Sequence, residues 1–295
     1  MFQDYLFFGV DSKVFYSYRM LHLSALVEEV RKMHNLNLER GLLLSDALLG
    51  SLLLSSLLAY EERINLRIHC GEHFTIGTES NFEAQTRGYI ECNEESDIVK
   101  QLDQGHKPET AFVVRSVRSQ KNKSSLFEGV TSTFTNNIQD ALNEHLSASY
   151  QMNTKIRLNS WVDTQTQTLC AFGVIYQELP EIPQQVSSKL GNYINSLPPM
   201  QELYMFNSDP DILAQKLIPD ETKAIKSICP KFVCACSSEK VEEAVALFPL
   251  EDIEDMIHKA NDVEVKCHYC GKNHVVTVKR IGEIYTKLLN LSHLN

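Results

Sequence analysis

The chain has 295 residues, 43% of them hydrophobic, and 28 Lys or Arg face 38 Asp or Glu, for a formal net charge of −10. The length predicts one large domain and a smaller one, and the acidic balance argues against a surface for nucleic acid or anionic membrane. The chain is too long and too poor in cysteine for a secreted disulfide scaffold, and Met1 to Asp4 do not open a signal peptide, so we expect a cytoplasmic protein.

The first predicted elements are a strand and a helix. Residues 14–18 (Val-Phe-Tyr-Ser-Tyr) have the composition of a strand. From Leu23 to Met33 the apolar residues recur at helical spacing. Ser24 is the expected N-cap of this helix.

Residues 41–60 form a Leu-rich segment, with ten Leu and no Lys or Arg. Its length could just span a bilayer. Asp46 and four serines argue against that reading, because a charge inside a membrane span is costly. A helix that is apolar nearly all round is also typical of the core of a large domain, so we expect a buried helix and no membrane contact.

Further strands and one helix follow. Residues 64–69 and 74–76 alternate in polarity on either side of Gly71, which predicts a β-hairpin. The remaining candidates are strands at 87–90, 111–114 and 169–176 and a helix over 138–146. Most strands alternate, which favours largely antiparallel sheets. The sequence therefore predicts an α+β fold, with residues 1–180 as an N-terminal domain of antiparallel sheets and helices.

The segment from 181 to 228 differs from what precedes it. Prolines break it into short stretches with helical spacing, and apolar residues persist along them. Short helices of this kind are stable only when they pack on something. We expect a metastable helical linker, followed by a small C-terminal module over 229–295 with helical patterns at 241–247 and 253–257 and a strand at 275–278.

Four cysteines in this module form the main candidate site: Cys234, Cys236, Cys267 and Cys270. CxC and CxxC pairs separated by thirty residues supply four soft thiolates, the ligand set of a closed structural zinc site. A module of this size buries too little apolar surface to fold securely alone, so a metal is expected to stabilise it. With four thiolates in place, the neighbouring histidines (His258, His268 and His274) are expected at the surface or behind the ligands.

The spacing of the cysteines also permits redox chemistry. Each pair is short enough to close as a disulfide if the metal leaves, and a bond between residues i and i+2 closes a strained ring. Oxidation of the ligands would remove the metal and its contribution to folding. Cys229, just before Pro230, is read as a nearby thiol that is not a ligand.

Three alternative functions have some support in the sequence. A zinc-ribbon nucleic-acid binder is disfavoured because residues 229–295 carry eight Lys or Arg against ten Asp or Glu. A thiol-disulfide oxidoreductase needs its CxxC at the start of a helix, whereas a strand-like run follows Cys270. The segment from His69 to His73 matches an HxxEH metalloprotease motif, but Gly71 places it in a hairpin where a helix is required.

Several segments resemble those of one known family. Residues 232–241 and 263–271, which contain the cysteine pairs, resemble the zinc module of heat shock protein 33, a redox-regulated chaperonin. Residues 86–89, 149–151 and 173–180 resemble recurring segments of its N-terminal domain. The resemblance covers essentially the whole chain.

The resemblance implies a chaperone of the holdase type and not an enzyme. It implies one Zn²⁺ per chain in an inactive reduced form, and disulfides Cys234–Cys236 and Cys267–Cys270 after oxidation. The C-terminal module and the linker would then lose order. The active form would be a homodimer that binds unfolding client proteins.

Overall fold

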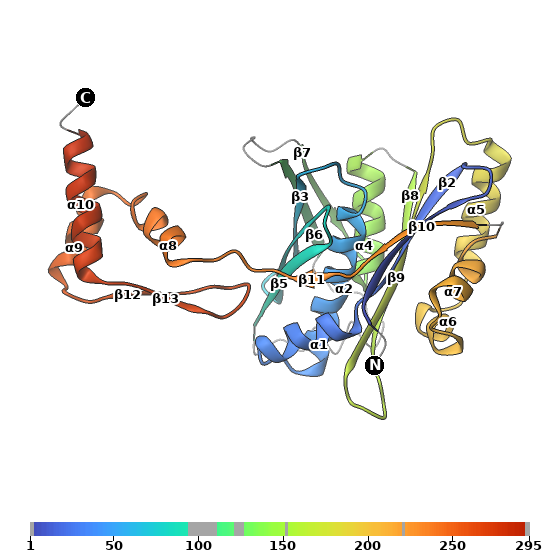
Figure 1. Ribbon diagram of the computed structural model, residues 1–295, viewed down its shortest axis with the longest axis horizontal. Coiled ribbons are helices and arrows are strands. Elements are labelled where there is room, and N and C mark those ends of the chain that lie inside the picture. Colours follow the sequence, from blue (N-terminus) through green and yellow to red (C-terminus); the bar gives the residue numbers. More distant parts are fainter. Residues whose placement is uncertain (1–2, 94–110, 121–126, 151–152, 220–221, 293–295) are drawn as a thin grey trace. The chain divides into compact units, whose positions relative to one another are not determined.

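The computed structural model describes residues 3–93, 111–120, 127–150, 153–219 and 222–292 (Figure 1). Gln151, in one of the family-like segments, lies outside these residues. The chain divides into two compact units, Met1–Val233 and Cys234–Asn295. The sequence predicts that the C-terminal module begins at Cys229. The division in the structure falls four residues later, so Cys229 belongs to the first unit.

The described residues of the first unit form two sheets. One has the strand order β10 (Thr222–Ile228), β1 (Tyr5–Asp11), β2 (Tyr16–His22), β9 (Leu169–Glu178) and β8 (Thr154–Val162). The other has the order β11 (Lys231–Phe232), β5 (Gln85–Cys92), β4 (Phe74–Asn81), β3 (Glu62–Cys70), β6 (Phe112–Gln120) and β7 (Phe127–Thr133). Apart from the parallel pair β5 and β11, the paired strands are antiparallel. The predicted α+β fold with largely antiparallel sheets is confirmed.

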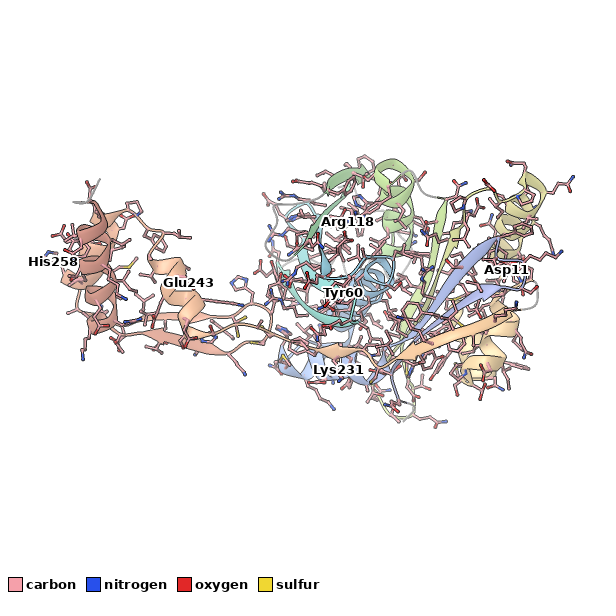
Figure 2. The ribbon with its side chains drawn as sticks, turned by 45° about the horizontal axis from the view of Figure 1, so that its top comes forward. Asp11, Tyr60, Arg118, Lys231, Glu243 and His258 are labelled. Atoms are coloured by element: carbon pink, nitrogen blue, oxygen red, sulfur yellow. The ribbon has the colours of Figure 1, made fainter. Side chains whose placement is uncertain are left out.

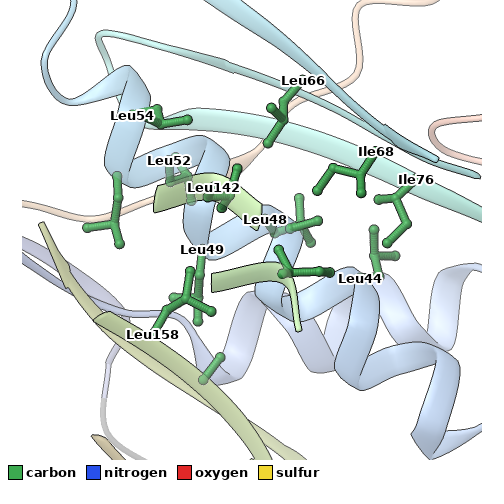
Figure 3. Close-up of a cluster of buried hydrophobic side chains, with 14 of the residues drawn as sticks. Leu44, Leu48, Leu49, Leu52, Leu54, Leu66, Ile68, Ile76, Leu142 and Leu158 are labelled. Atoms are coloured by element: carbon green, nitrogen blue, oxygen red, sulfur yellow. The ribbon is translucent and has the colours of Figure 1, made fainter. Parts of the chain in front are cut away.

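The Leu-rich helix α2 (Leu38–Ser55) lies between the two sheets. It contacts β8 and β9 of one sheet and β3, β4 and β5 of the other, and leucines on opposite sides of it are buried (Figure 3). Gly88 and Gly173 allow this approach, because a Cβ on Gly88 would lie 2.9 Å from Leu48 and one on Gly173 3.2 Å from Leu53. The helix is apolar all round because it has a sheet on each side. Within the described residues, no helix is long and apolar enough to cross a membrane.

Helix α1 (Ser24–Met33) is where the sequence predicts it, but its expected cap is wrong. The N-cap position is Leu23, and the hydroxyl of Ser24 accepts a hydrogen bond from the backbone N–H of Ala171 instead. The free N–H groups of the first turn are satisfied by the carboxylate of Asp4, which accepts from Ala25 at 3.0 Å and from Leu26 at 2.7 Å. The cap comes from a residue about 20 positions earlier, so no local motif marks it.

Helix α4 (Ile138–His145) continues into a π-helical turn (Leu146–Tyr150) and packs against β6, β7 and β8. Three further helices follow β9: α5 (Gln184–Ser196), α6 (Met200–Phe206) and α7 (Pro210–Leu217). Their apolar residues join a second core cluster with the five-stranded sheet, so the expected docking of these helices is confirmed.

The helical prediction is wrong for residues 222–228, which form the edge strand β10. This strand pairs with β1 in antiparallel register, from Leu6 opposite Ile228 to Asp11 opposite Thr222. Apart from the partly buried Ile228, its described side chains are exposed, so local polarity does not reveal the strand. Its conformation follows from pairing with a distant segment of the chain.

Within residues 234–292, the second unit contains three helices and a hairpin. They are α8 (Ser238–Val245), α9 (Leu250–His258), β12 (Val263–Lys266), β13 (Asn273–Val276) and α10 (Val278–Ser292). Five buried residues form its core: Val245, Ile253, Val276, Ile281 and Ile284. The strand predicted at 275–278 begins at Asn273 and ends at Val276, because α10 starts at Val278.

Candidate metal centre

Two different local structures position the four cysteines of the second unit. Cys234 and Cys236 lie in an irregular segment directly before α8, whose N-cap Ser237 accepts from the backbone N–H of Lys240. Cys267 and Cys270 lie in the turn between β12 and β13. In the CxC pair the two cysteines are only two residues apart, and in the CxxC pair a tight turn joins them. Each pair therefore has its two thiols close in space.

The CxxC turn is closed by backbone hydrogen bonds. The N–H of Cys267 donates to the carbonyl of Lys272 at 2.9 Å, and the N–H of Gly271 donates to the carbonyl of Cys267 at 2.8 Å. Gly271 has a φ of 69°, a left-handed conformation that glycine adopts without strain. The glycine after the last cysteine is therefore part of what shapes the site.

The four Sγ atoms lie within 4.8 Å of one another. Cys234 Sγ is 3.7 Å from Cys267 Sγ, and Cys236 Sγ is 3.4 Å from Cys270 Sγ. A tetrahedral Zn²⁺ with Zn–S distances of about 2.3 Å places its sulfurs about 3.8 Å apart. The thiol arrangement fits that ion, and the described residues contain no other cluster of this kind.

The protonation of these thiols favours the same interpretation. Loss of solvent, followed by hydrogen bonds with the neighbouring thiols, raises the pKa of Cys236 to about 12. The same loss of solvent raises the pKa of Cys270. Burial therefore favours the protonated form of Cys236 and Cys270, whereas a bound divalent cation favours the thiolate form of its cysteine ligands.

The histidines near the cysteines are not part of this cluster. His258 is exposed at the end of α9, with Nε2 3.9 Å from Glu254 (Figure 2). His274 Nδ1 is 3.5 Å from the hydroxyl of Ser238. This arrangement agrees with the expected Cys₄ set, whose metal ligation stays a prediction.

The other four cysteines lie in the first unit. Cys70 is buried, and burial raises the pKa of its thiol to about 11. Burial also raises the pKa of Cys92 and of Cys170. Cys229 is exposed, and its Sγ is 3.8 Å from Gln3 Nε2. All eight cysteines are free thiols in this structure.

The geometry does not favour two of the alternative functions. The CxxC turn leads into β13 and not into a helix, unlike the redox motif of an oxidoreductase. His69 lies in β3 with Nδ1 2.9 Å from Thr75 Oγ1, and Gly71, with a φ of 50°, begins the turn toward His73. The helix that an HxxEH metal site requires is therefore not formed there.

Comparison with known proteins identifies the family. The fold and the four-thiol cluster define a two-unit α+β protein with a candidate metal centre. The family model described as Hsp33 protein matches residues 4–277, so the chain belongs to the Hsp33 family.

Relatives cover nearly the whole chain. The 33 kDa chaperonin of Lachnoclostridium phytofermentans is 26% identical over 274 residues, which cover 89% of this chain and 91% of the relative. That of Desulforamulus reducens is 24% identical over 299 residues, which cover 97% and 98%. The crystal structure of the 33 kDa chaperonin (heat shock protein 33 homolog) from Thermotoga maritima has the same fold, with a TM-score of 0.81 and 21% identity over 98% of this chain and 100% of that one.

Proposed function

We propose that this protein is a redox-regulated chaperone, a holdase that binds unfolding proteins under oxidative stress and prevents their aggregation. Membership of the Hsp33 family, with relatives named 33 kDa chaperonins, supports the chaperone function. The observation that carries the redox regulation is the convergence of four thiols within 4.8 Å in a unit with a five-residue buried core.

In the reduced form, Cys234, Cys236, Cys267 and Cys270 hold one Zn²⁺ per chain. Structural zinc supplies on the order of 10–16 kcal/mol of apparent binding free energy in small modules. Burial of the five apolar side chains of the core contributes about 8–15 kcal/mol, so the metal contributes about as much as the whole apolar core. The second unit therefore depends on the metal for its stability, and the reduced protein is inactive.

Oxidation pairs Cys234 with Cys236 and Cys267 with Cys270. Each pair loses two electrons, and with hydrogen peroxide as oxidant each peroxide takes up two electrons and two protons and leaves as two waters. The sulfur contacts at 3.7 and 3.4 Å join cysteines of different motifs, so disulfides within each motif replace these contacts. A disulfide ligates metal poorly, so the binding energy of the ion no longer stabilises the unit.

The consequence is an exposed apolar surface. The second unit loses order, and the linker helices between residues 184 and 217 separate from the five-stranded sheet. The apolar side chains of their shared core cluster are then free to bind unfolded client proteins in the cytoplasm, and two chains associate as a homodimer. This is binding and not catalysis, and no nucleic acid takes part.

The test is light scattering from a denaturing client, with zinc release measured in the same samples. The peroxide-treated protein should suppress aggregation, and the reduced zinc-loaded protein should not. The Cys234→Ser/Cys267→Ser variant should contain no zinc and should suppress aggregation without peroxide. Cys229→Ser, the matched control in the first unit, should keep both its zinc and its need for peroxide. A double variant that still needs peroxide would place the switch elsewhere.

A further inference from the structure

Arginines gather on the solvent-facing side of the six-stranded sheet, away from α2 and α4. In β3, Leu66 and Ile68 point into the core, so Arg67 between them points outward and is exposed. In β6, Val114 and Ser116 are buried in the same way, and Arg115 is exposed. Strand alternation therefore places both guanidinium groups on the outer face.

Arg67 and Arg115 are direct cross-strand partners in the antiparallel pairing of β3 with β6. Directly opposite residues have Cβ atoms about 4.5–5.5 Å apart, and like charges at this distance are destabilising. Arg115 has one partner, since its Nε donates to Glu128 at 2.8 Å. Among the described residues Arg67 has no ion pair. The sheet thus keeps an unfavourable pair of charges on an exposed surface.

A cavity of about 280 Å³ lies beside this pair. Its lining is rich in hydrogen-bond donors: Arg63, Asn65, Arg67, Arg115 and Ser119, together with Glu79 and Val117. Glu79 is already engaged, with Arg87 at 2.9 Å and Arg63 at 3.5 Å. Its charge is therefore offset before any ligand enters.

The charges around the cavity leave a positive excess in a chain that is acidic overall. Four arginines (63, 67, 87 and 115) face two glutamates (79 and 128), which leaves two positive charges. The pKa of the nearby His69 is lowered by burial and then by the charge of Arg67, in keeping with a positive local field. A doubly charged oxyanion would match this excess, and guanidinium groups bind such groups through paired N–H donors.

We propose that this cavity binds a phosphate group, with Arg67 and Arg115 as the principal ligands and Asn65 and Arg63 as further donors. The site lies wholly in the first unit and is independent of the four cysteines. Its function goes beyond the redox switch: it recognises a phosphoryl dianion, either free or at the end of a phosphate chain.

The experiment is equilibrium dialysis of the full-length, reduced, zinc-loaded protein against radiolabelled inorganic phosphate at constant ionic strength. Wild-type protein should bind one phosphate per chain in a saturable manner. Arg67→Gln should weaken binding about tenfold or more, the loss expected for one charge-assisted contact. Lys13→Gln, which removes the same charge from an exposed turn, should bind phosphate as the wild type does. Tripolyphosphate as a second probe distinguishes the sources: tighter binding identifies a phosphate chain, and equal binding a single terminal phosphate.

A purely structural role for Arg67 predicts a different result. If Arg67 serves binding at the expense of stability, Arg67→Gln should melt at the same or a higher temperature than wild type without phosphate, because a like-charge contact is removed. A lower melting temperature would indicate a structural residue. The proposal is overturned if wild-type protein binds neither probe saturably, or if Arg67→Gln binds inorganic phosphate as well as wild type.

Discussion

His145 is a fully buried imidazole with a hydroxyl partner on each nitrogen. Its Nε2 lies 2.7 Å from Ser116 Oγ and its Nδ1 2.9 Å from Thr131 Oγ1. Burial lowers the pKa of His145 to about 4, so the ring is neutral in the folded protein near neutral pH. Because its partners lie on β6 and β7, this side chain ties α4 to the six-stranded sheet.

Acid should destabilise the first unit through this residue. Between pH 6.5 and 4 the unfolded chain binds a proton at position 145 that the folded chain does not, so the free energy of unfolding falls as the pH falls through this window. His145→Gln should cost about 1–3 kcal/mol at pH 7, because it disturbs a buried network. It should also flatten the fall in melting temperature between pH 7 and 5.

Thermal denaturation followed by circular dichroism at several pH values measures both effects. His22, whose pKa burial also lowers to about 4, stays in the variant, so part of the pH dependence should remain. An unchanged pH profile in His145→Gln would contradict the assignment of a neutral buried ring.

At the scale of elements, polar side chains as well as apolar ones fix the three helices after β9 to the sheet. Arg157 of β8 donates to the carbonyl of Ile194 at 2.7 Å, near the end of α5. The hydroxyl of Tyr176 in β9 donates to the carbonyl of Leu217 at 2.9 Å, at the end of α7. Both bonds satisfy carbonyls that helix ends leave without partners.

Two substitutions at neighbouring positions of α5 test its stability, because one should destabilise the docked helix and the other should stabilise it. Leu190 is buried in the cluster with the sheet, so Leu190→Ala should weaken docking by about 2–5 kcal/mol. Gly191 has nothing within 4 Å of where a Cβ would lie, so Gly191→Ala should strengthen the helix by up to about 1 kcal/mol.

Hydrogen exchange of the amides in 184–217 measures both changes. Under the proposed function, Leu190→Ala should also lower the peroxide concentration needed for chaperone activity, and Gly191→Ala should raise it. Equal exchange in the two variants would mean that α5 does not dock through Leu190.

Local signals predicted much of the fold, and the CxC and CxxC spacings predicted which four cysteines lie close together. The helical spacing after Leu23 and the alternation around Gly71 each depend on neighbouring residues, and both elements are confirmed. The expected cap at Ser24 is wrong because the capping group is the distant Asp4, and β10 is missed because its partner is β1. Helix α10 had a usable signal in Ile281 and Ile284, which its apolar spacing places on one face.

At the scale of the whole molecule, the two units differ greatly in the number of apolar residues that they bury. The first buries residues from two sheets around α2 and has a second cluster under the linker helices. The described part of the second unit buries five apolar residues in one cluster, and it also contains the four thiols. The two units should therefore differ in how much they depend on the metal.

Removal of the metal should separate two unfolding transitions. With a strong zinc chelator under reducing conditions, the second unit should unfold. The first unit, with α2 between its two sheets, should still unfold in one cooperative transition. Differential scanning calorimetry with and without chelator measures this, and hydrogen exchange locates the loss within 234–292. Coincident loss of both transitions would show that the first unit also depends on the metal.

The pairing of β1 with β10 has a consequence for synthesis on the ribosome. β1 is synthesised long before β10, yet Leu6 lies opposite Ile228 in the finished sheet. At about 5–20 residues per second, the gap between the two strands corresponds to about 10–40 s of translation. Throughout that interval one edge of β1 has no partner from its own chain, so the nascent protein itself presents an open strand to its surroundings.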